Sequence, residues 1–262
     1  MNARREQRFV EYDDVRIEVL AEGTGRPVVL LPSLGRDSYD YDDVAEGLAA
    51  NGFRVLRPIP RGMGGSTGPM EDVTLHDFAR DIAAVVEDEG GGPAVLVGHA
   101  YGHFVARMTA ADRPDLVCGV GCAASAARSY PDRLSELVAV AADPQRPEDE
   151  RLDALGTAFF APGNDPGEWL AGWYPEVRAL QRRASDRTDK AEWWDVAPSP
   201  ILDLQGGADP WRPESTRNEL QERFGDLVDA VVIPGASHAF FPERPREIIA
   251  AITAWARDLP GG

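Results

Sequence analysis

Short apolar runs alternate with longer amphipathic stretches along most of the chain. The apolar runs are rich in valine, leucine and isoleucine and are bounded by glycine, proline or polar residues, as buried strands are. A hairpin over 8–12 and 15–20 precedes predicted strands at 27–32, 54–59, 94–97, 116–123, 201–205 and 230–233. The amphipathic stretches predict helices over 42–51, 75–88, 101–112, 214–224 and 246–256. This alternation predicts an α/β fold: a mostly parallel eight-stranded sheet flanked by helices.

One segment interrupts this alternation. Residues 126–198 are rich in proline, acidic residues, arginine and tryptophan, and contain no run typical of a buried strand. We therefore expect a core of residues 1–125 and 199–262 and a helical cap of residues 126–198. Ligands bind beyond the carboxyl ends of parallel strands, so the insertion is expected to cover the site as a lid. A second small domain or a partner-binding surface is the alternative.

Composition narrows the possible partners. The net charge of −17 disfavours nucleic acid and anionic membranes, and its simplest role is solubility. No apolar stretch approaches the ~20 residues of a membrane span, and no apolar run follows the first arginines, so a cytoplasmic location is expected. Cys118 and Cys122 share one apolar run without metal-ligand spacing, which predicts free thiols and no metal. We predict a small-molecule substrate and no cofactor; the oligomeric state is not predicted.

The segment Gly98-His-Ala100-Tyr-Gly102 lies between a predicted strand and a predicted helix. The pattern G-x-S-x-G forms a sharp turn there that raises its central side chain above the sheet, and the glycines avoid clashes with neighbouring backbone. Gly98 and Gly102 fit this pattern, but the central residue is Ala100 instead of serine. The spacing and its context together indicate a nucleophile-elbow turn.

Two later segments fit the same arrangement. Asp209 follows a predicted strand, and His238 lies in a loop before the last helix. A carboxylate there can accept a hydrogen bond from an imidazole, which fixes the tautomer of the ring and stabilises its cation. The order elbow, acid, histidine is the order of this triad in α/β sheets. We predict a His238–Asp209 pair; separate loop roles are the alternative.

A third segment, Pro32-Ser33-Leu34-Gly35, follows the strand at 27–32. We predict that backbone N–H groups of Leu34 and Tyr101 form an oxyanion hole, with Ser33 beside the substrate. A plain turn without such a role is the alternative.

With these motifs in place, the chain resembles the α/β-hydrolase superfamily over nearly its whole length. The strand, loop and "RGMGGS" turn within residues 30–69 and the segment "PGASHAFFPERPREI" are similar to family segments. The resemblance implies hydrolysis of an ester, lactone, amide or C–C bond by a Ser-His-Asp triad. Asp209 and His238 match the triad, and Ala100 does not.

Alanine has no nucleophilic atom, so residue 100 cannot form an acyl-enzyme. Three interpretations remain: an engineered Ser→Ala inactive variant, a natural enzyme whose His238–Asp209 dyad works without a covalent step, or a catalytically silent ligand-binding protein. We favour hydrolysis of an ester or lactone, with the dyad as general base for water. The same base could instead serve a lyase, a cyclase or a cofactor-free oxygenase.

The predicted cap is dense in aromatic residues. They form either its own core or the wall of a pocket for an apolar substrate. We expect substrate contacts from Phe159, Trp173 and Trp194, and from Trp211 close after Asp209.

Overall fold

A computed structural model describes residues 5–260 as one eight-stranded sheet with helices on both faces. The strand order is β1-β2-β4-β3-β5-β6-β7-β8; β1 and β2 are antiparallel to their neighbours, and all later pairs are parallel. The strands are β1 Glu6–Tyr12, β2 Val15–Gly23, β3 Arg26–Leu31, β4 Phe53–Pro58, β5 Ala94–His99, β6 Val117–Ala123, β7 Ile201–Gly206 and β8 Val228–Ile233. The α/β fold predicted from the sequence is confirmed.

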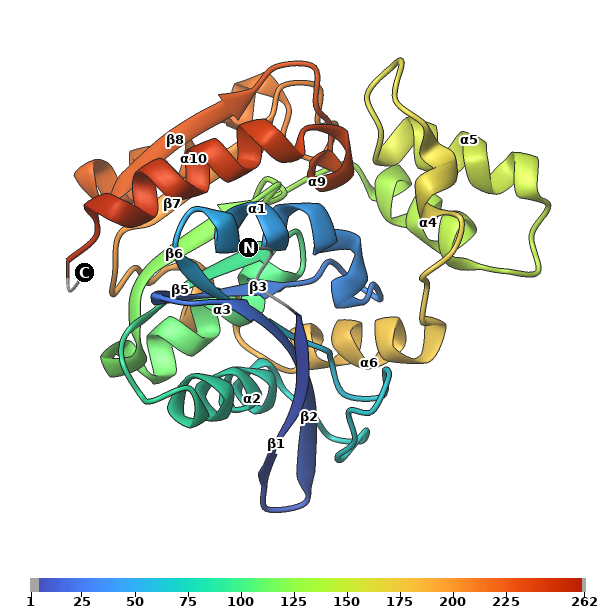
Figure 1. Cartoon of the computed structure of the whole chain (residues 1–262). Helices are drawn as coiled ribbons and strands as arrows, with labels where there is room; N and C mark the ends of the chain where they lie inside the picture. The colour runs from blue at the N-terminus through green and yellow to red at the C-terminus, as the bar shows by residue number, and fades with distance from the viewer. Residues whose placement is uncertain (1–4, 261–262) are drawn as a thin grey trace.

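Helices cover the two faces of the sheet (Figure 1), and each face has its own apolar core. The helices α1 Asp42–Ala50, α9 Phe240–Glu243 and α10 Pro245–Asp258 pack on one face. The helices α2 Leu75–Asp88, α3 Gly102–Asp112 and α8 Glu219–Phe224 pack on the other. Short 3-10 helices lie at η1 Ser38–Tyr41, η2 Pro114–Leu116, η3 Pro166–Trp169, η4 Glu214–Thr216 and η5 Gly225–Leu227. Apolar residues on both sides explain why the central strands are continuously hydrophobic.

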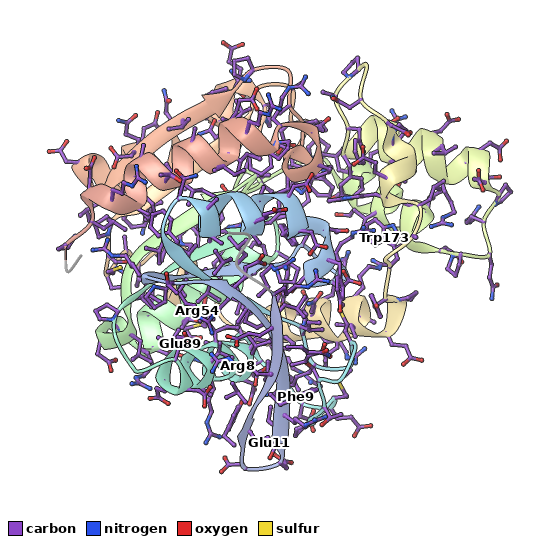
Figure 2. All side chains as sticks on the ribbon, in the orientation of Figure 1. Arg8, Phe9, Glu11, Arg54, Glu89 and Trp173 are labelled. Atoms are coloured by element: carbon purple, nitrogen blue, oxygen red, sulfur yellow. The ribbon has the colours of Figure 1, made fainter. Side chains whose placement is uncertain are left out.

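The antiparallel edge of the sheet is held to α2 by charged side chains. Arg8 on β1 and Arg54 on β4 both pair with Glu89, the residue after α2, as Figure 2 shows. The Arg54 Nε and Glu89 Oε1 atoms are 2.7 Å apart. These contacts fix the hairpin far from the carboxyl ends of the parallel strands.

The insertion between β6 and β7 is helical, but its helices do not form one separate body. It contains α4 Asp132–Ala142, α5 Glu148–Ala158, α6 Pro175–Asp186 and α7 Lys190–Trp194. The pair α4 and α5 has its own apolar cluster and lies to one side of the sheet (Figure 1). In contrast, Leu180 of α6 and Trp193 of α7 belong to the core beneath α2 and α3. The division at residues 126 and 198 therefore stays a prediction.

One helix predicted from periodicity is interrupted. Residues 214–224 form η4 and α8 rather than one helix, with Arg217 and Asn218 between them. The side chains of Gln205 and Arg212 donate hydrogen bonds to the carbonyl of Arg217, at 2.8 and 3.3 Å. This carbonyl is thus bound by distant residues, which the local pattern does not reveal.

The topology brings several loops to one place. The chain passes from β3 outward to β4 and returns to β5 on the other side of β3, so β3 and β5 are neighbours at a switch point of the sheet. A crevice forms where strand connections diverge in this way. Within residues 5–260, no helix combines the length and the apolar character needed to cross a membrane.

Candidate active site

Ala100 occupies a strained turn between β5 and α3. Its φ is 46°, a left-handed conformation that residues with a Cβ seldom adopt. Its amide donates a 2.8 Å hydrogen bond to the carbonyl of Ala123 at the end of β6. The turn thus has the strained backbone that an elbow needs, although its side chain is only a methyl group.

The two glycines of the motif are required by close backbone approaches. A Cβ atom on Gly98 would overlap the backbone of Gly102, and a Cβ on Gly102 would overlap the carbonyl of Leu31 at the end of β3. The start of α3 therefore lies directly against the loop that follows β3. This contact brings the predicted oxyanion loop beside Ala100.

Asp209 and His238 are in contact. Asp209 follows β7 and His238 follows β8, and the Nδ1 atom of His238 is 2.9 Å from Oδ2 of Asp209. The other carboxylate oxygen accepts the Trp211 amide at 2.8 Å, which orients the acid. Both residues are only 4% exposed. Because an ionised carboxylate only accepts, Nδ1 carries the proton, and Nε2 is the ring nitrogen left for a molecule in the site.

The loop after β3 offers a backbone donor next to the elbow. The amide of Ser33 donates to the Tyr41 hydroxyl at 3.0 Å, and that of Gly35 donates to Gln181 Oε1 at 2.7 Å. Across residues 5–260, the amides of Leu34 and Tyr101 have no hydrogen-bond acceptor. These are the two donors that the sequence predicts for an oxyanion hole, and both residues line one cavity.

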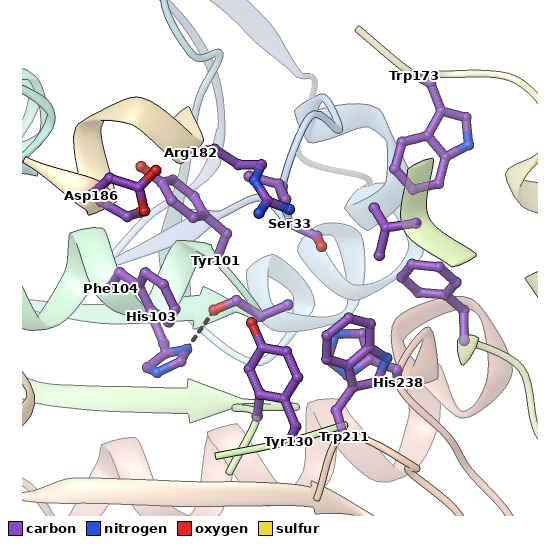
Figure 3. Close-up of a pocket in the computed structure, with 16 residues that line it drawn as sticks. Ser33, Tyr101, His103, Phe104, Tyr130, Trp173, Arg182, Asp186, Trp211 and His238 are labelled. Atoms are coloured by element: carbon purple, nitrogen blue, oxygen red, sulfur yellow. Dashed lines mark hydrogen bonds between the residues drawn. The ribbon is translucent and has the colours of Figure 1, made fainter. Parts of the chain in front are cut away.

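A cavity of about 170 Å³ brings these groups together (Figure 3). The Ala100 methyl group and the His238 ring both line it, and Trp211 stacks on His238 with ring centres 5.1 Å apart. Arg182, Ser185 and Asp186 of α6 add polar groups to its wall. The remaining lining residues are mostly apolar or aromatic: Ser33, Leu34, Tyr101, His103, Phe104, Ala126, Tyr130, Val138, Phe159 and Trp173. Four predicted contact residues, Ser33, Phe159, Trp173 and Trp211, are among the lining residues.

Trp194 is not among the residues that line this cavity but lines a neighbouring one, so its predicted contact with substrate stays a prediction. The Arg107 side chain of α3 donates to the Trp194 carbonyl at 2.6 Å, and its guanidinium carbon lies 5.3 Å from the ring centre. These contacts hold Trp194 in the core beneath α3, where it borders a neighbouring cavity of about 220 Å³.

Two histidines flank the elbow, and both are fully buried. His99 is enclosed by aromatic rings and hydrogen-bonded at both nitrogens, and burial lowers its pKa to about 3. The Nδ1–H group of His103 donates to the carbonyl of Ala100, and burial holds the His103 pKa well below its usual value. Both rings are therefore neutral at pH 7. His103 also lines the cavity.

The insertion is bonded to the loop after β3. The Tyr174 amide donates to the Gly35 carbonyl at 2.9 Å. Buried Arg36 pairs with Asp40 through bonds of 2.6 and 2.7 Å, and it donates to the carbonyl of Ala171 at 2.7 Å. Its guanidinium also lies over the rings of Trp169 and Trp173. The loop after β3, the predicted oxyanion loop, is thus fixed by residues of the insertion. Within residues 5–260, no group of three His, Cys, Asp or Glu side chains is placed to hold a metal ion.

Comparisons with known proteins agree with the fold. The chain is 25% identical over 279 residues to the 2-(acetamidomethylene)succinate hydrolase of Mesorhizobium japonicum, an alignment that covers 94% of this chain and 93% of the relative. Epoxide hydrolase A of Mycobacterium tuberculosis is 36% identical over 106 residues, which cover 38% of this chain and only 32% of that enzyme. The soluble epoxide hydrolase of a Corynebacterium species is likewise matched over 35% of its length.

Solved structures share the fold over nearly the whole chain. An esterase from Exiguobacterium antarcticum superposes with a TM-score of 0.80 at 18% identity, covering 95% of this chain and 99% of the esterase. Epoxide hydrolase A from Mycobacterium thermoresistibile gives a TM-score of 0.73 at 22% identity, covering 99% of this chain and all of the enzyme. Residues 28–251 match the model of the alpha/beta hydrolase family. The chain therefore belongs to the alpha/beta hydrolase family.

Proposed function

We propose that this chain hydrolyses an ester or lactone of a small apolar substrate by direct attack of water, with His238 as the general base. The observation that carries the proposal is the 2.9 Å contact between His238 and Asp209 on the wall of the cavity that contains the Ala100 methyl group. A histidine steadied by a carboxylate is a suitable base near neutral pH. The aromatic wall of the cavity favours an apolar substrate.

The reaction is balanced without a covalent enzyme intermediate. Nε2 of His238 takes a proton from water while the water oxygen attacks the carbonyl carbon, and Asp209 stabilises the imidazolium that forms. The Leu34 and Tyr101 amides stabilise the oxyanion. As the carbonyl re-forms, the bond to the leaving oxygen breaks, and the imidazolium returns the proton to that oxygen. The products are a carboxylic acid and an alcohol, or a hydroxy acid from a lactone.

The methyl group at position 100 determines which reaction is available. It has no lone pair, so any route through an acyl- or alkyl-enzyme at this residue is excluded. Dyad and oxyanion-hole chemistry can still operate: triad variants of other hydrolases retain about 10³–10⁴-fold catalysis over water. We therefore expect slow but genuine turnover.

The test is turnover of a panel of aryl esters and lactones by the unaltered chain and by His238→Ala. Hydrolysis in H₂¹⁸O should place ¹⁸O in the acid product, His238→Ala should abolish the activity, and a fluorophosphonate probe should not label the unaltered enzyme. Absence of turnover across the panel would reject hydrolysis and favour either a non-hydrolytic acid/base reaction or ligand binding without catalysis. Retained ligand affinity in His238→Ala and Asp209→Asn would favour the binding protein.

A further inference from the structure

A continuous chain of hydrogen bonds runs behind the cavity. The Ser33 amide donates to the Tyr41 hydroxyl at 3.0 Å, and that hydroxyl lies 2.8 Å from Nδ1 of His99. On the other side of the ring, Nε2 of His99 lies 2.7 Å from the backbone carbonyl of His238. The side chains in the middle are sealed from solvent, since Tyr41 is 1% exposed and His99 is 0% exposed.

Only one arrangement of protons satisfies every bond. A backbone carbonyl can only accept, so Nε2 of His99 carries the proton. The ring is neutral because burial lowers its pKa to about 3, which leaves Nδ1 as an acceptor. The Tyr41 hydroxyl therefore donates its single proton to Nδ1, and its oxygen accepts the Ser33 amide. Each link thus fixes the direction of the next.

The two ends of this series of hydrogen bonds lie at the two functional elements of the proposed site, the oxyanion hole and the general base. Ser33 precedes Leu34, whose amide is a predicted oxyanion donor, and His238 carries the predicted base. We propose that Tyr41 and His99 are positioning residues that hold the Leu34 amide and the His238 ring in register on either side of Ala100. The inference rests on the proposed function, because it assigns these residues a role in the same site.

The placement of His99 explains why an imidazole is suited to this role. It is the last residue of β5, directly before Ala100, and the rings of Trp169, Phe240 and Phe241 surround it. Its rigid ring reaches both the η1 segment and the loop after β8. An apolar residue would fill the same space but leave buried polar groups unpaired. A displacement of ~1 Å at a reacting group can cost about 10²-fold in rate. Loss of either hydrogen bond of His99 should therefore lower the rate measurably.

Three variants test the Tyr41–His99 and His99–His238 hydrogen bonds separately. Tyr41→Phe removes only the hydroxyl. In His99→Gln the amide reaches the position of Nε2 and keeps the bond to His238, whereas in His99→Asn it reaches the position of Nδ1 and keeps the bond to Tyr41. Tyr12→Phe is the matched control, since it removes a hydroxyl bonded to Arg61 at 3.1 Å on the hairpin side of the molecule.

On an ester that the unaltered enzyme hydrolyses, Tyr41→Phe and both His99 variants should lower kcat about 10–100-fold and change KM by less than about threefold. Tyr12→Phe should leave both constants unchanged. An unchanged kcat in Tyr41→Phe would overturn the inference, as would a loss of rate that matches the loss of folded protein at the assay temperature.

A second readout does not need turnover. In ¹H–¹⁵N spectra, Tyr41→Phe should shift the resonances of His238, since the hydrogen-bonded route between the two residues passes through His99. Ring packing of Tyr41 on Phe241 is a second route. In a His99→Gln background, which no longer accepts from Tyr41, the added Tyr41→Phe change should leave His238 unaffected. A His238 shift that persists in this background would show transmission through ring packing and would overturn the inference. If the coupling is present and no ester is hydrolysed, the proposed function fails while the structural link stands.

Discussion

The amide of Ala100 is hydrogen-bonded to the carbonyl of Ala123, one strand away, over 2.8 Å. Together with the close contacts at Gly98 and Gly102 and the hydrogen bond from the His103 side chain to the Ala100 carbonyl, this bond holds the left-handed backbone of residue 100. The geometry of the turn is therefore independent of the side chain at position 100. A nucleophile can be introduced there without rebuilding the site.

Ala100→Ser should produce a hydroxyl that a fluorophosphonate probe labels at residue 100. The new oxygen would project into the cavity that His238 lines, and assistance by a general base contributes about 10²–10⁴-fold to such a reaction. Intact-protein mass spectrometry measures the adduct, and a tryptic digest locates it. The double variant Ala100→Ser, His238→Ala should react slowly. A folded Ala100→Ser protein that is no more reactive than its parent would contradict the predicted orientation of the dyad.

Asp209→Asn should reduce ester hydrolysis by about 10²–10⁴-fold with little change in KM. The amide preserves the shape of the side chain, but it cannot stabilise the imidazolium as a carboxylate does. The measurement is kcat on the ester that the parent enzyme hydrolyses best. Glu214→Gln, an exposed acid in the segment that follows, is the matched control and should retain full activity. Equal losses in the two variants would argue against a specific role of Asp209.

Gly98→Ala should destabilise the fold by roughly 2–3 kcal/mol, because its methyl group would overlap the backbone of Gly102. Gly156→Ala should instead raise stability by up to about 1 kcal/mol, since this glycine lies in α5 with open space at its Cβ position. Urea unfolding followed by circular dichroism measures both. A Gly98→Ala protein as stable as its parent would show that the elbow is less tightly packed than the structure indicates.

Buried His99 should make the protein less stable as the pH decreases from 6.5 toward 5. In the unfolded chain His99 takes up a proton near pH 6.5, whereas burial lowers its pKa in the fold to about 3. The unfolded state then binds more protons, which lowers the free energy of unfolding by up to about 1.4 kcal/mol per pH unit for each such group. The groups facing the ring are the Tyr41 hydroxyl, the His238 carbonyl and ring, and the positive charge of Arg36.

Urea titrations at pH 7, 6 and 5 measure this slope. His99→Gln should reduce it, and His103, whose pKa burial also lowers, accounts for a remaining part. An identical slope in the parent and in His99→Gln would mean that His99 is protonated in the folded protein.

Much of the fold and part of the candidate site could be predicted from local sequence patterns. Each parallel strand has its own apolar run, and the elbow has glycines at fixed spacing, so both are visible within a few residues of chain. The contact between Asp209 and His238 could be anticipated because chain order in this fold places the loops after β7 and β8 side by side.

The sequence could not reveal features that depend on distant side chains. Tyr41 and His99 meet only after β5 and η1 are packed together, so their hydrogen bond has no local signature. For Trp194 the sequence leaves two alternatives open, because aromatic residues in an insertion fit a pocket wall and a buried core equally well. In the structure Trp194 packs in the core against Arg107 of α3 and also lines the cavity next to the one that contains Ala100.

The insertion is hydrogen-bonded to three segments that surround the candidate site. Tyr174 and Gln181 bind Gly35 of the oxyanion loop, the Phe159 carbonyl accepts the amide of Ala239 beside His238, and the Ala158 carbonyl accepts Trp211. The insertion and the candidate site are therefore not independent modules. We therefore expect a chimera that carries the insertion of another family member to lose these contacts and, with them, the positions of the loops around the site.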